Sequence, residues 1–514
     1  MSVRHVLLLC LLLAVSACST TPAIHTSQAL APQASDFGRH LQRLAERHPG
    51  QSGFYLLDDS EQAFAARAEL IRAAGSSLDL QYYIMHDGLS TRTLIDEVLQ
   101  AADRGVRVRI LLDDTASDGR DYEISLLAAH PNIQVRVFNP LHLGRTIGVT
   151  RVLGRALQLG RQHRRMHNKL WLADSSAAIV GGRNLGDEYF DAEPTFNFTD
   201  IDLLAVGPVA EQLAHSFDQY WNSALSKPIR QFLYWPASSR DLRQARKRLQ
   251  AYLTRASLKQ PELYQQLLGY REQPRLPQWL EQLTWAPGWA LWDAPAKVLA
   301  DGEPDAQLLM ASQLEPKLSD LSQELLLVSA YFVPTRDGTR YLVDQANRGV
   351  AVRILTNSLE ATDVPAVHGG YAPYRRKLLE HGVRLFEMRR QPGNGGSAPY
   401  SFSGSSESSL HSKAIVLDRR YAFIGSLNFD PRSILWNTEV GVLVDSPELS
   451  EQVRRLALEG MRPGISYEVL LVEGTLRWRA EDNGQVHELS REPGSLWRRI
   501  NAWFAERIGL ERML

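Results

Sequence analysis

The sequence predicts an α/β protein built from two copies of one lobe, each a mixed β-sheet flanked by helices. Three observations support this expectation. The chain has 514 residues, which is more than one hydrophobic core usually serves. A set of residues recurs at a constant spacing in the two halves. In each half, buried strand patterns alternate with helical ones, as is typical of sheets covered by helices.

The internal repeat has an offset of 244 residues. The segment that begins Arg104-Gly-Val returns at Arg348-Gly-Val, and His167 returns as His411. The other recurring pairs are Lys169 and Lys413, Asp174 and Asp418, Gly181 and Gly425, and Asn184 and Asn428. One offset shared by so many positions indicates a duplicated lobe rather than two chance motifs.

Each copy is expected to open with a buried strand, over 78–84 and 325–333, followed by a helix and a second strand over 106–112 and 350–355. The strand after each histidine is followed at once by another apolar run, so we predict two tight hairpins. Their turns fall near Asp174-Ser175 and Asp418-Arg419.

The other segments give the domain boundaries. We expect the first lobe over 37–229, an inter-lobe insertion over 230–310 and the second lobe over 311–514. The insertion contains a basic helical pattern and then Trp285, Trp289 and Trp292. This region is either a solvated basic face followed by core aromatics or a patch for the membrane interface. Residues 496–514 predict an amphipathic helix that packs on the body or rests on lipid.

The amino terminus, residues 1–18, resembles a lipoprotein-type signal peptide, with an apolar run that ends in Val15-Ser-Ala-Cys18. We expect lipidation at Cys18; an ordinary signal peptide and a short anchor are the alternatives. Residues 19–36 are then a flexible tether. Because Cys10 and Cys18 are the chain's two cysteines, the mature body has no internal disulfide. The predicted location is the bacterial cell envelope, with a lipid-anchored body in the periplasm, and Ser19 favours the outer membrane over the inner.

The overall charge excludes a global attraction to polyanions, because the formal net charge is −1. Any basic site must be local. Such a local patch precedes the first histidine and consists of Arg145, Arg151, Arg155, Arg161, Arg164 and Arg165. It is either a solvated loop or a site for anionic head groups.

The paired motif predicts covalent phosphoryl chemistry in one shared active site. One imidazole can attack phosphorus while the other protonates the departing alcohol, and His167 and His411 supply one imidazole from each lobe. In a strand, residues two apart share a face, so each motif lysine can join its histidine at one phosphate. The expected hydrogen-bond donors to the phosphate are Lys169, Lys413, Asn184 and Asn428. This chemistry requires no metal and no other cofactor.

The chain resembles the phospholipase D superfamily, with its paired HKD motifs, and within it the bacterial cardiolipin synthases of the C type. The resemblance runs from about residue 37 to the end and is most specific over 165–169, 181–190, 200–207, 425–433 and 437–439. It implies two lobes that face each other across a pseudo-twofold axis, with Asp174 and Asp418 supporting them. It further implies that Asp200 orients His411. Glu439 would orient His167, which the resemblance favours as the nucleophile.

The resemblance implies a membrane-associated phosphatidyltransferase that makes cardiolipin from phosphatidylglycerol and a second phospholipid through a phosphohistidine. The alternatives are a phospholipase D that hydrolyses phospholipids and a phosphodiesterase or nuclease. A scaffold without activity is disfavoured, because both sets of histidine, lysine and asparagine are intact. The expected partners are anionic and zwitterionic phospholipids and the membrane surface rather than nucleic acid.

Overall fold

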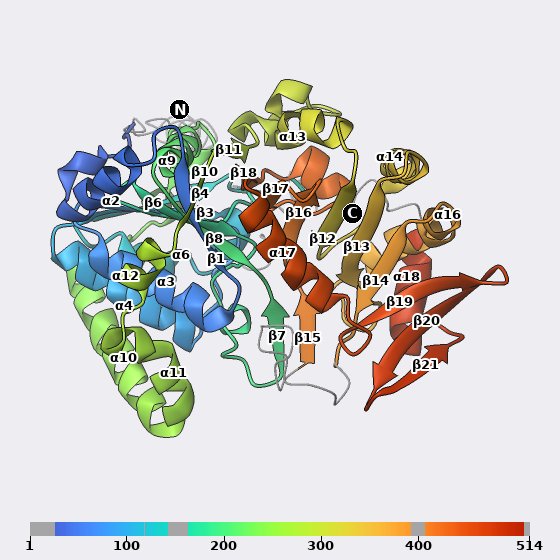
Figure 1. Ribbon diagram of the computed structural model, residues 1–514. Helices are drawn as coiled ribbons and strands as arrows, with labels where there is room; N and C mark the ends of the chain where they lie inside the picture. The colour runs from blue at the N-terminus through green and yellow to red at the C-terminus, as the bar shows by residue number, and fades with distance from the viewer. Residues whose placement is uncertain (1–25, 118, 142–162, 392–406, 508–514) are drawn as a thin grey trace, which may run out of the picture.

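Two β-sheets, one from each half of the chain, form the body of the protein (Figure 1). The computed structural model describes residues 26–117, 119–141, 163–391 and 407–507. The signal-peptide segment, Cys18 and four of the patch arginines (Arg145, Arg151, Arg155 and Arg161) lie outside the described residues. In the described part of the chain, no helix combines the length and the apolar composition needed to cross a bilayer.

The first sheet has nine strands among the described residues, and β2, β3 and β4 run parallel while their neighbours are antiparallel. In order across the sheet the strands are β10 (Thr284–Ala286), β1 (Ser52–Leu57), β8 (Asp202–Val206), β6 (Ala177–Gly181), β5 (Leu170–Ala173), β2 (Ser77–Tyr82), β3 (Arg107–Asp113), β4 (Ile133–Phe138) and β9 (Ser226–Pro228). The helices of this lobe are α2 (Asp36–Glu46), α3 (Ser60–Ala73), α4 (Leu89–Asp103), α5 (Asp114–Ser117), α6 (Asp121–Leu127), α9 (Pro208–Trp221), α10 (Ser239–Lys259), α11 (Pro261–Glu272) and α12 (Leu276–Glu281).

The second sheet has ten strands in the described ranges: β11 (Gly288–Trp292), β18 (Val440–Asp445), β17 (Tyr421–Gly425), β16 (Lys413–Leu417), β12 (Glu324–Ser329), β13 (Ala351–Asn357), β14 (Arg384–Met388), β19 (Ser466–Val472), β20 (Thr475–Asp482) and β21 (Gln485–Leu489). Its helices are α13 (Met310–Ser319), α14 (Thr335–Asn347), α15 (Pro365–Tyr371), α16 (Arg375–Glu380), α17 (Pro447–Gly460) and α18 (Leu496–Arg507). The order β18-β17-β16-β12-β13-β14 repeats the order β8-β6-β5-β2-β3-β4 of the first sheet. The predicted duplication of one mixed-sheet lobe is therefore confirmed.

Both predicted hairpins are also confirmed. β5 pairs with β6 and β16 pairs with β17, each antiparallel. The turn residues Asp174 and Ser175 have φ of 51° and 53°, and Asp418 and Arg419 have φ of 51° and 54°. Two successive left-handed residues make the turn type that matches the twist of a hairpin, and aspartate tolerates this conformation better than most residues.

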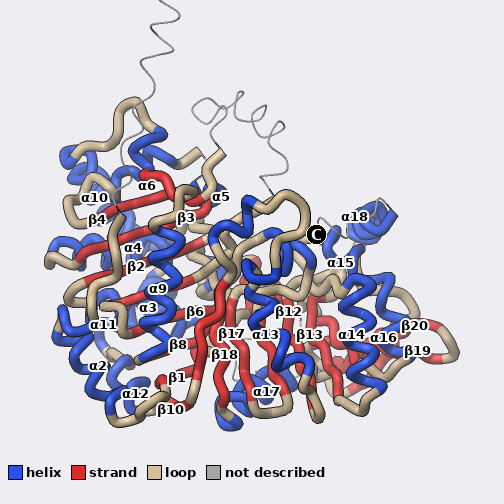
Figure 2. Tube along the Cα trace, turned by 90° about the horizontal axis from the view of Figure 1, so that it is seen from above, coloured by secondary structure: helices blue, strands red, loops and turns tan. Residues whose placement is uncertain are grey.

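A central core joins the lobes, and both sheets together with α9 and α17 contribute to it. Side chains from both sheets and both helices share one buried cluster, which includes Leu172, Val180, Phe217, Val416, Ile424 and Leu456. β17 and β18 lie beside β6 (Figure 2). A small third sheet also crosses the interface, since β7 (Phe196–Thr199) of the first lobe pairs in parallel with β15 (Glu407–Leu410) of the second. The relative position of the lobes is thus fixed by packing and by backbone hydrogen bonds.

The stretch 230–310, which the sequence sets apart as an insertion, is divided between the two lobes. Its helices α10 and α11 pack on the first lobe through Leu253 and Leu267, and β10 pairs with β1. After Pro287 the chain crosses over, and β11 pairs with β18 of the second sheet. The basic pattern on α10 is mostly solvated, although Arg246 pairs with Asp103.

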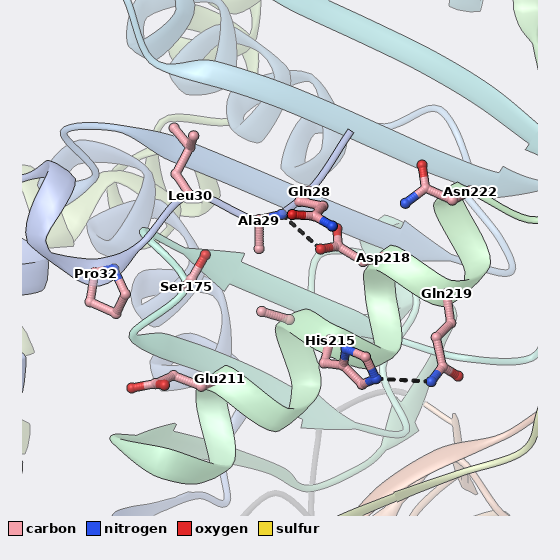
Figure 3. A pocket seen from close by; sticks show the side chains of 11 residues that line it. Gln28, Ala29, Leu30, Pro32, Ser175, Glu211, His215, Asp218, Gln219 and Asn222 are labelled. Atoms are coloured by element: carbon pink, nitrogen blue, oxygen red, sulfur yellow. Dashed lines mark hydrogen bonds between the residues drawn. The ribbon is translucent and has the colours of Figure 1, made fainter. Parts of the chain in front are cut away.

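The segment 26–36 differs from the predicted tether, because it is docked on the body rather than free. Ser27 and Asn222 exchange two hydrogen bonds of 3.0 Å, and Ala29 N donates to Asp218 at 2.7 Å. Figure 3 shows this segment against α9, where together they line a cavity of about 510 Å³. Backbone groups of the segment satisfy polar side chains at the end of α9, and this explains why a polar, proline-containing sequence is ordered here.

Candidate active site

The two motif histidines sit at the seam between the lobes, and each is held there by the backbone of the opposite lobe. His167 N donates to Thr438 O at 2.8 Å, and His411 N donates to Thr199 O at 2.8 Å. His167 immediately precedes the hairpin of the first lobe, and His411 lies between β15 and β16 of the second. The matching contacts give the site its approximate twofold symmetry.

Each imidazole is bonded to a carboxylate from the other lobe. His167 Nδ1 lies 2.9 and 3.0 Å from the two carboxylate oxygens of Glu439. His411 Nδ1 lies 2.7 Å from Asp200 Oδ2. Because Nδ1 is occupied in both rings, Nε2 is the nitrogen left for reaction, and the carboxylate fixes the tautomer and the ring orientation.

The two histidines line one cavity of about 260 Å³. The motif asparagines Asn184 and Asn428 line it as well. The remaining lining residues are Tyr83, Ile84, Tyr189, Tyr331, Asp363, Val364, Val367, Asp430, Arg432, Ser433 and Asn437. The cavity therefore brings together imidazole, amide, phenol, carboxyl and guanidinium groups from both lobes, as a site for a phosphodiester would require.

The motif lysines are buried beside the histidines rather than along the cavity wall. Lys169 Nζ donates to His167 O at 2.6 Å, and Lys413 Nζ donates to His411 O. Each lysine is 1% exposed. The bond to the histidine backbone uses one of the three donor hydrogens of an ammonium. The lysines thus position each histidine and place positive charge behind it.

The electrostatics of the site favour neutral imidazoles at rest. Burial, together with Lys169, Lys413 and Arg432, lowers the pKa of His167 well below its usual value. Burial and Lys413 lower the pKa of His411 to about 4, against the opposing effect of Asp200. A neutral imidazole has a free lone pair on one ring nitrogen, which is what nucleophilic attack or proton acceptance needs.

The two carboxylates differ in their ionisation. Burial raises the pKa of Glu439 to about 7, although Lys169 and the hydroxyl of Ser426 oppose the shift. Burial acts in the same direction on Asp200, but the hydrogen bond from His411, together with the charges of Lys413 and Arg183, outweighs it and lowers the pKa of Asp200. Asp200 is therefore the more firmly ionised partner.

The motif aspartates lie away from the cavity, at the hairpin turns. Asp174 accepts bonds from the backbone N–H groups of Gly75, Ser76 and Ser77 at 2.8–2.9 Å. Asp418 accepts from Ser322, Gln323 and Glu324 in the same way. Each aspartate thus ties its hairpin to the start of the central strand, β2 or β12, a supporting position as the resemblance implies.

Several cavity residues were not predicted from the sequence. Tyr83 and Tyr331 follow the carboxyl ends of the equivalent strands β2 and β12, and Asp430 and Arg432 follow the second asparagine of the motif. Tyr331 OH donates to Asp363 Oδ2 at 2.8 Å. An aromatic residue within two positions of the end of a buried strand is the signal that could have indicated the tyrosines, since loops that follow strands commonly carry site residues.

Among the described residues, one group of histidine and carboxylates is compact enough for a metal ion: His368, Glu387 and Glu492. Arg375 lies inside this group, with Nε 2.9 Å from Glu387 Oε1, and also pairs with Glu492. The guanidinium already neutralises the carboxylates, so this group is an ion-pair cluster of the second lobe.

The fold and the paired histidine sites define the chain as an enzyme of the phospholipase D superfamily. The family described as "Cardiolipin synthase, PLD-like domain" matches residues 68–221 and 316–459. The chain is 37% identical over 478 residues to cardiolipin synthase C of Escherichia coli K12, covering 92% of this chain and 98% of the relative. The chain therefore belongs to this cardiolipin synthase family, whose PLD-like domain it contains twice, and it is a phosphatidyltransferase by class.

More distant relatives agree with this placement. Cardiolipin synthase A of Pseudomonas entomophila is 25% identical over 407 residues, covering 78% of this chain and 67% of the relative. The crystal structure of a phosphatidylserine synthase from Haemophilus influenzae superposes with a TM-score of 0.58 at 11% identity, covering 92% of this chain and 100% of that chain. At that identity the likeness concerns the fold alone.

Proposed function

We propose that this enzyme makes cardiolipin by transferring the phosphatidyl group of a second phospholipid to phosphatidylglycerol, through a phosphohistidine at His167. The observation that carries the proposal is the single cavity lined by two imidazoles, each bonded through Nδ1 to a carboxylate of the opposite lobe. Such an arrangement suits a nucleophile and an acid–base group acting on one phosphodiester. The similarity to cardiolipin synthase C supports the choice of lipid.

In the first step, His167 Nε2 forms a bond to the phosphorus of the donor lipid while the bond from phosphorus to the head-group alcohol breaks. His411, whose Nδ1 is bonded to Asp200, takes up a proton on Nε2 from water as the anionic phosphodiester binds beside it, and it then gives that proton to the departing alkoxide. In the second step, a glycerol hydroxyl of phosphatidylglycerol attacks the phosphohistidine, and His411 takes the hydroxyl proton. Cardiolipin leaves, His411 releases its proton to water, and both imidazoles return to their neutral resting states. Arg432 and the two motif lysines neutralise the phosphate oxygens as charge moves onto them.

The unequal carboxylates support the assignment of roles. An imidazole accepts a proton more readily beside an ionised carboxylate. Asp200 has a lowered pKa, whereas burial raises that of Glu439 to about 7. His411 is therefore the better acid–base group, and His167 is the better neutral nucleophile.

The substrate test uses the full chain in vesicles of phosphatidylglycerol and phosphatidylethanolamine, with lipid products identified by mass spectrometry. Cardiolipin as the main product is the expected result. Phosphatidic acid without cardiolipin would replace the proposal by hydrolysis, and cleavage of an oligonucleotide with no lipid product would replace it by nuclease activity. His167→Ala is the inactive control, and His215→Ala, an exposed histidine on α9, is the matched control.

We further propose that the enzyme is held at the membrane through lipid on Cys18, in the bacterial envelope. The support is the sequence Val15-Ser-Ala-Cys18 and the phospholipid chemistry of the relatives. Cys18→Ser is expected to abolish labelling by radioactive palmitate in cells and to change the fractionation of the protein. Unchanged labelling would contradict the anchor and leave the proposed reaction untouched.

A further inference from the structure

The last helix of the described chain carries its large apolar side chains on the outside. α18 buries two small residues, Ala502 and Ala505, against the second lobe. Its large apolar residues are exposed by between 37% and 72%, and they are Leu496, Trp497, Ile500, Trp503 and Phe504. Spacings of one, four, seven and eight residues place all five on one face. A helix on a globular body normally buries such a face in the core, so α18 has the reverse arrangement.

Close contacts fix α18 in this orientation. Its backbone approaches α15 so tightly that a Cβ added at Gly369 would lie 2.2 Å from Ala502 O. Just before the helix, Glu492 pairs with Arg375 and lies 2.6 Å from His368 Nε2. The exposed apolar face is consequently presented by a docked helix and not by a loosely attached one.

The helix α18 also lies close to the catalytic cavity. Arg498 donates to the carbonyl oxygens of Leu359 and Thr362, at 3.2 and 2.6 Å. The next residues of that loop, Asp363 and Val364, line the cavity that contains both histidines. Figure 2 shows α18 beside α15, which follows this loop directly. The helix that carries the apolar face is therefore bonded to the loop that forms part of the cavity wall.

We propose that the outward face of α18 is a docking surface for an anionic phospholipid bilayer, which brings the catalytic cavity to the membrane interface. Tryptophan and phenylalanine favour this interface, and an exposed apolar patch with a polar rim marks an interaction site. The exposed Arg499 and Arg507 flank the face, and Arg507 lies 5.5 Å from the ring centre of Trp503. Their charge complements lipid phosphates. This proposal rests on the proposed function in one respect: the docked bilayer supplies substrate only if the cavity acts on phospholipids.

The test compares the full chain with a variant that carries Trp497→Ser, Ile500→Ser, Trp503→Ser and Phe504→Ser. Both proteins are assayed on phosphatidylglycerol/phosphatidylethanolamine vesicles and on short-chain forms of the same two lipids dissolved below their micelle concentrations. Turnover on vesicles is expected to fall at least about tenfold, since the removed apolar area no longer leaves water. Turnover of the dissolved substrate should stay within about twofold, because the site itself is unchanged. Vesicles should also slow amide hydrogen exchange over 496–507 in the unmodified chain but not in the variant.

Two controls identify the occupant. The double variant Tyr234→Ser/Trp235→Ser removes two aromatic side chains that are each 85% exposed on the first lobe, and it should behave as the unmodified chain. Vesicles of phosphatidylcholine alone should protect α18 less than anionic vesicles do, because Arg499 and Arg507 lose their partners.

Equal vesicle turnover and equal protection in the α18 variant would overturn the proposal. So would a dimer in sedimentation that the α18 substitutions dissociate while vesicle turnover persists, since the face would then join two copies of the chain. If the unmodified chain made no new phospholipid but vesicles still protected α18, the proposed reaction would be wrong and the docking surface would stand.

Discussion

The two histidine–carboxylate pairs occupy equivalent places in the duplicated fold, yet they are not chemically equal. The first pair is His167 with Glu439, and the second pair is His411 with Asp200. Asp200 and Glu439 each precede by two residues the strand position that pairs with the motif glycine, Gly181 or Gly425. The acid is longer in the first pair, and its pKa is raised to about 7 by burial, while that of Asp200 is lowered. The duplicated fold thus contains two similar histidine–carboxylate pairs that differ locally, and the proposed division of roles rests on this difference.

The residue packed against each carboxylate accounts for the difference in side-chain length between Asp200 and Glu439. Beside Asp200 stands Gly182, where an added Cβ would lie 2.4 Å from the carboxylate oxygens. The equivalent residue in the second lobe is Ser426, whose hydroxyl donates to Glu439. Gly182 therefore leaves room for the short side chain of Asp200 beside His411. In the second lobe the hydroxyl of Ser426 holds the longer Glu439 beside His167. The backbone is equivalent in the two lobes, and the residue at this one position, Gly182 or Ser426, matches the length of the acid beside it.

Removal of each histidine in turn is expected to have the largest effect. His167→Ala and His411→Ala should each lower turnover of natural lipid by about 10⁴-fold or more, because members of one catalytic unit fail together. Only His411→Ala should still accumulate phosphoenzyme from a substrate with a p-nitrophenol leaving group, which departs without a proton. Rapid-quench trapping with labelled phosphate measures this. Trapping in His167→Ala but not in His411→Ala would reverse the two roles.

Replacing the carboxylates tests whether the pairs really differ. Asp200→Asn and Glu439→Gln should each lower kcat by about 10²–10⁴-fold, since an amide holds the imidazole less well and stabilises no imidazolium. The loss in kcat of Asp200→Asn should be at least about tenfold smaller with the p-nitrophenol substrate, because p-nitrophenolate departs in the first step without a proton from His411. The loss in Glu439→Gln should be similar for both substrates. Equal behaviour of the two variants would show that the pairs are interchangeable.

The motif aspartates differ in burial, and this difference predicts unequal losses of stability. Asp174 is fully buried and bonds three backbone N–H groups and two serine hydroxyls. Asp174→Ala should lower the free energy of unfolding by about 3 kcal/mol, because buried donors lose their acceptor. Asp418 is partly open to water, so Asp418→Ala should cost about 1 kcal/mol. Urea unfolding measures both values, and equal losses would contradict the argument.

The smallest expected effects concern the residues beside the carboxylates. Gly182→Ala should lower kcat by about tenfold, because its Cβ pushes Asp200 away from His411. Ser426→Ala should lower kcat by about threefold, since Glu439 loses one hydrogen bond but keeps both contacts to His167. The double variant Ser426→Gly/Glu439→Asp gives the first pair the residues of the second, and it should retain more activity than Glu439→Asp alone. A lack of this rescue would show that the glycine is not what accommodates the short acid.

Local sequence determined the duplication, the two hairpins and the identity of both histidines, lysines and asparagines. Each of these features is encoded by residues close together in the chain: an alternating strand, a turn aspartate with positive φ, or a motif at one offset. The cross-lobe partners Asp200 and Glu439 came from family resemblance, because no local pattern ties them to a histidine more than 200 residues away.

Only the tertiary structure decided which groups share the cavity and which face each element presents. It placed Arg432 and Tyr331 on the cavity wall and turned the motif lysines towards the histidine carbonyl oxygens. It also divided 230–310 between the sheets and set α18 with its large apolar side chains outward. These outcomes depend on contacts between segments far apart in the chain. A periodic pattern shows that a helix has an apolar face, but only the packing of the rest of the molecule decides whether that face meets the core or the solvent.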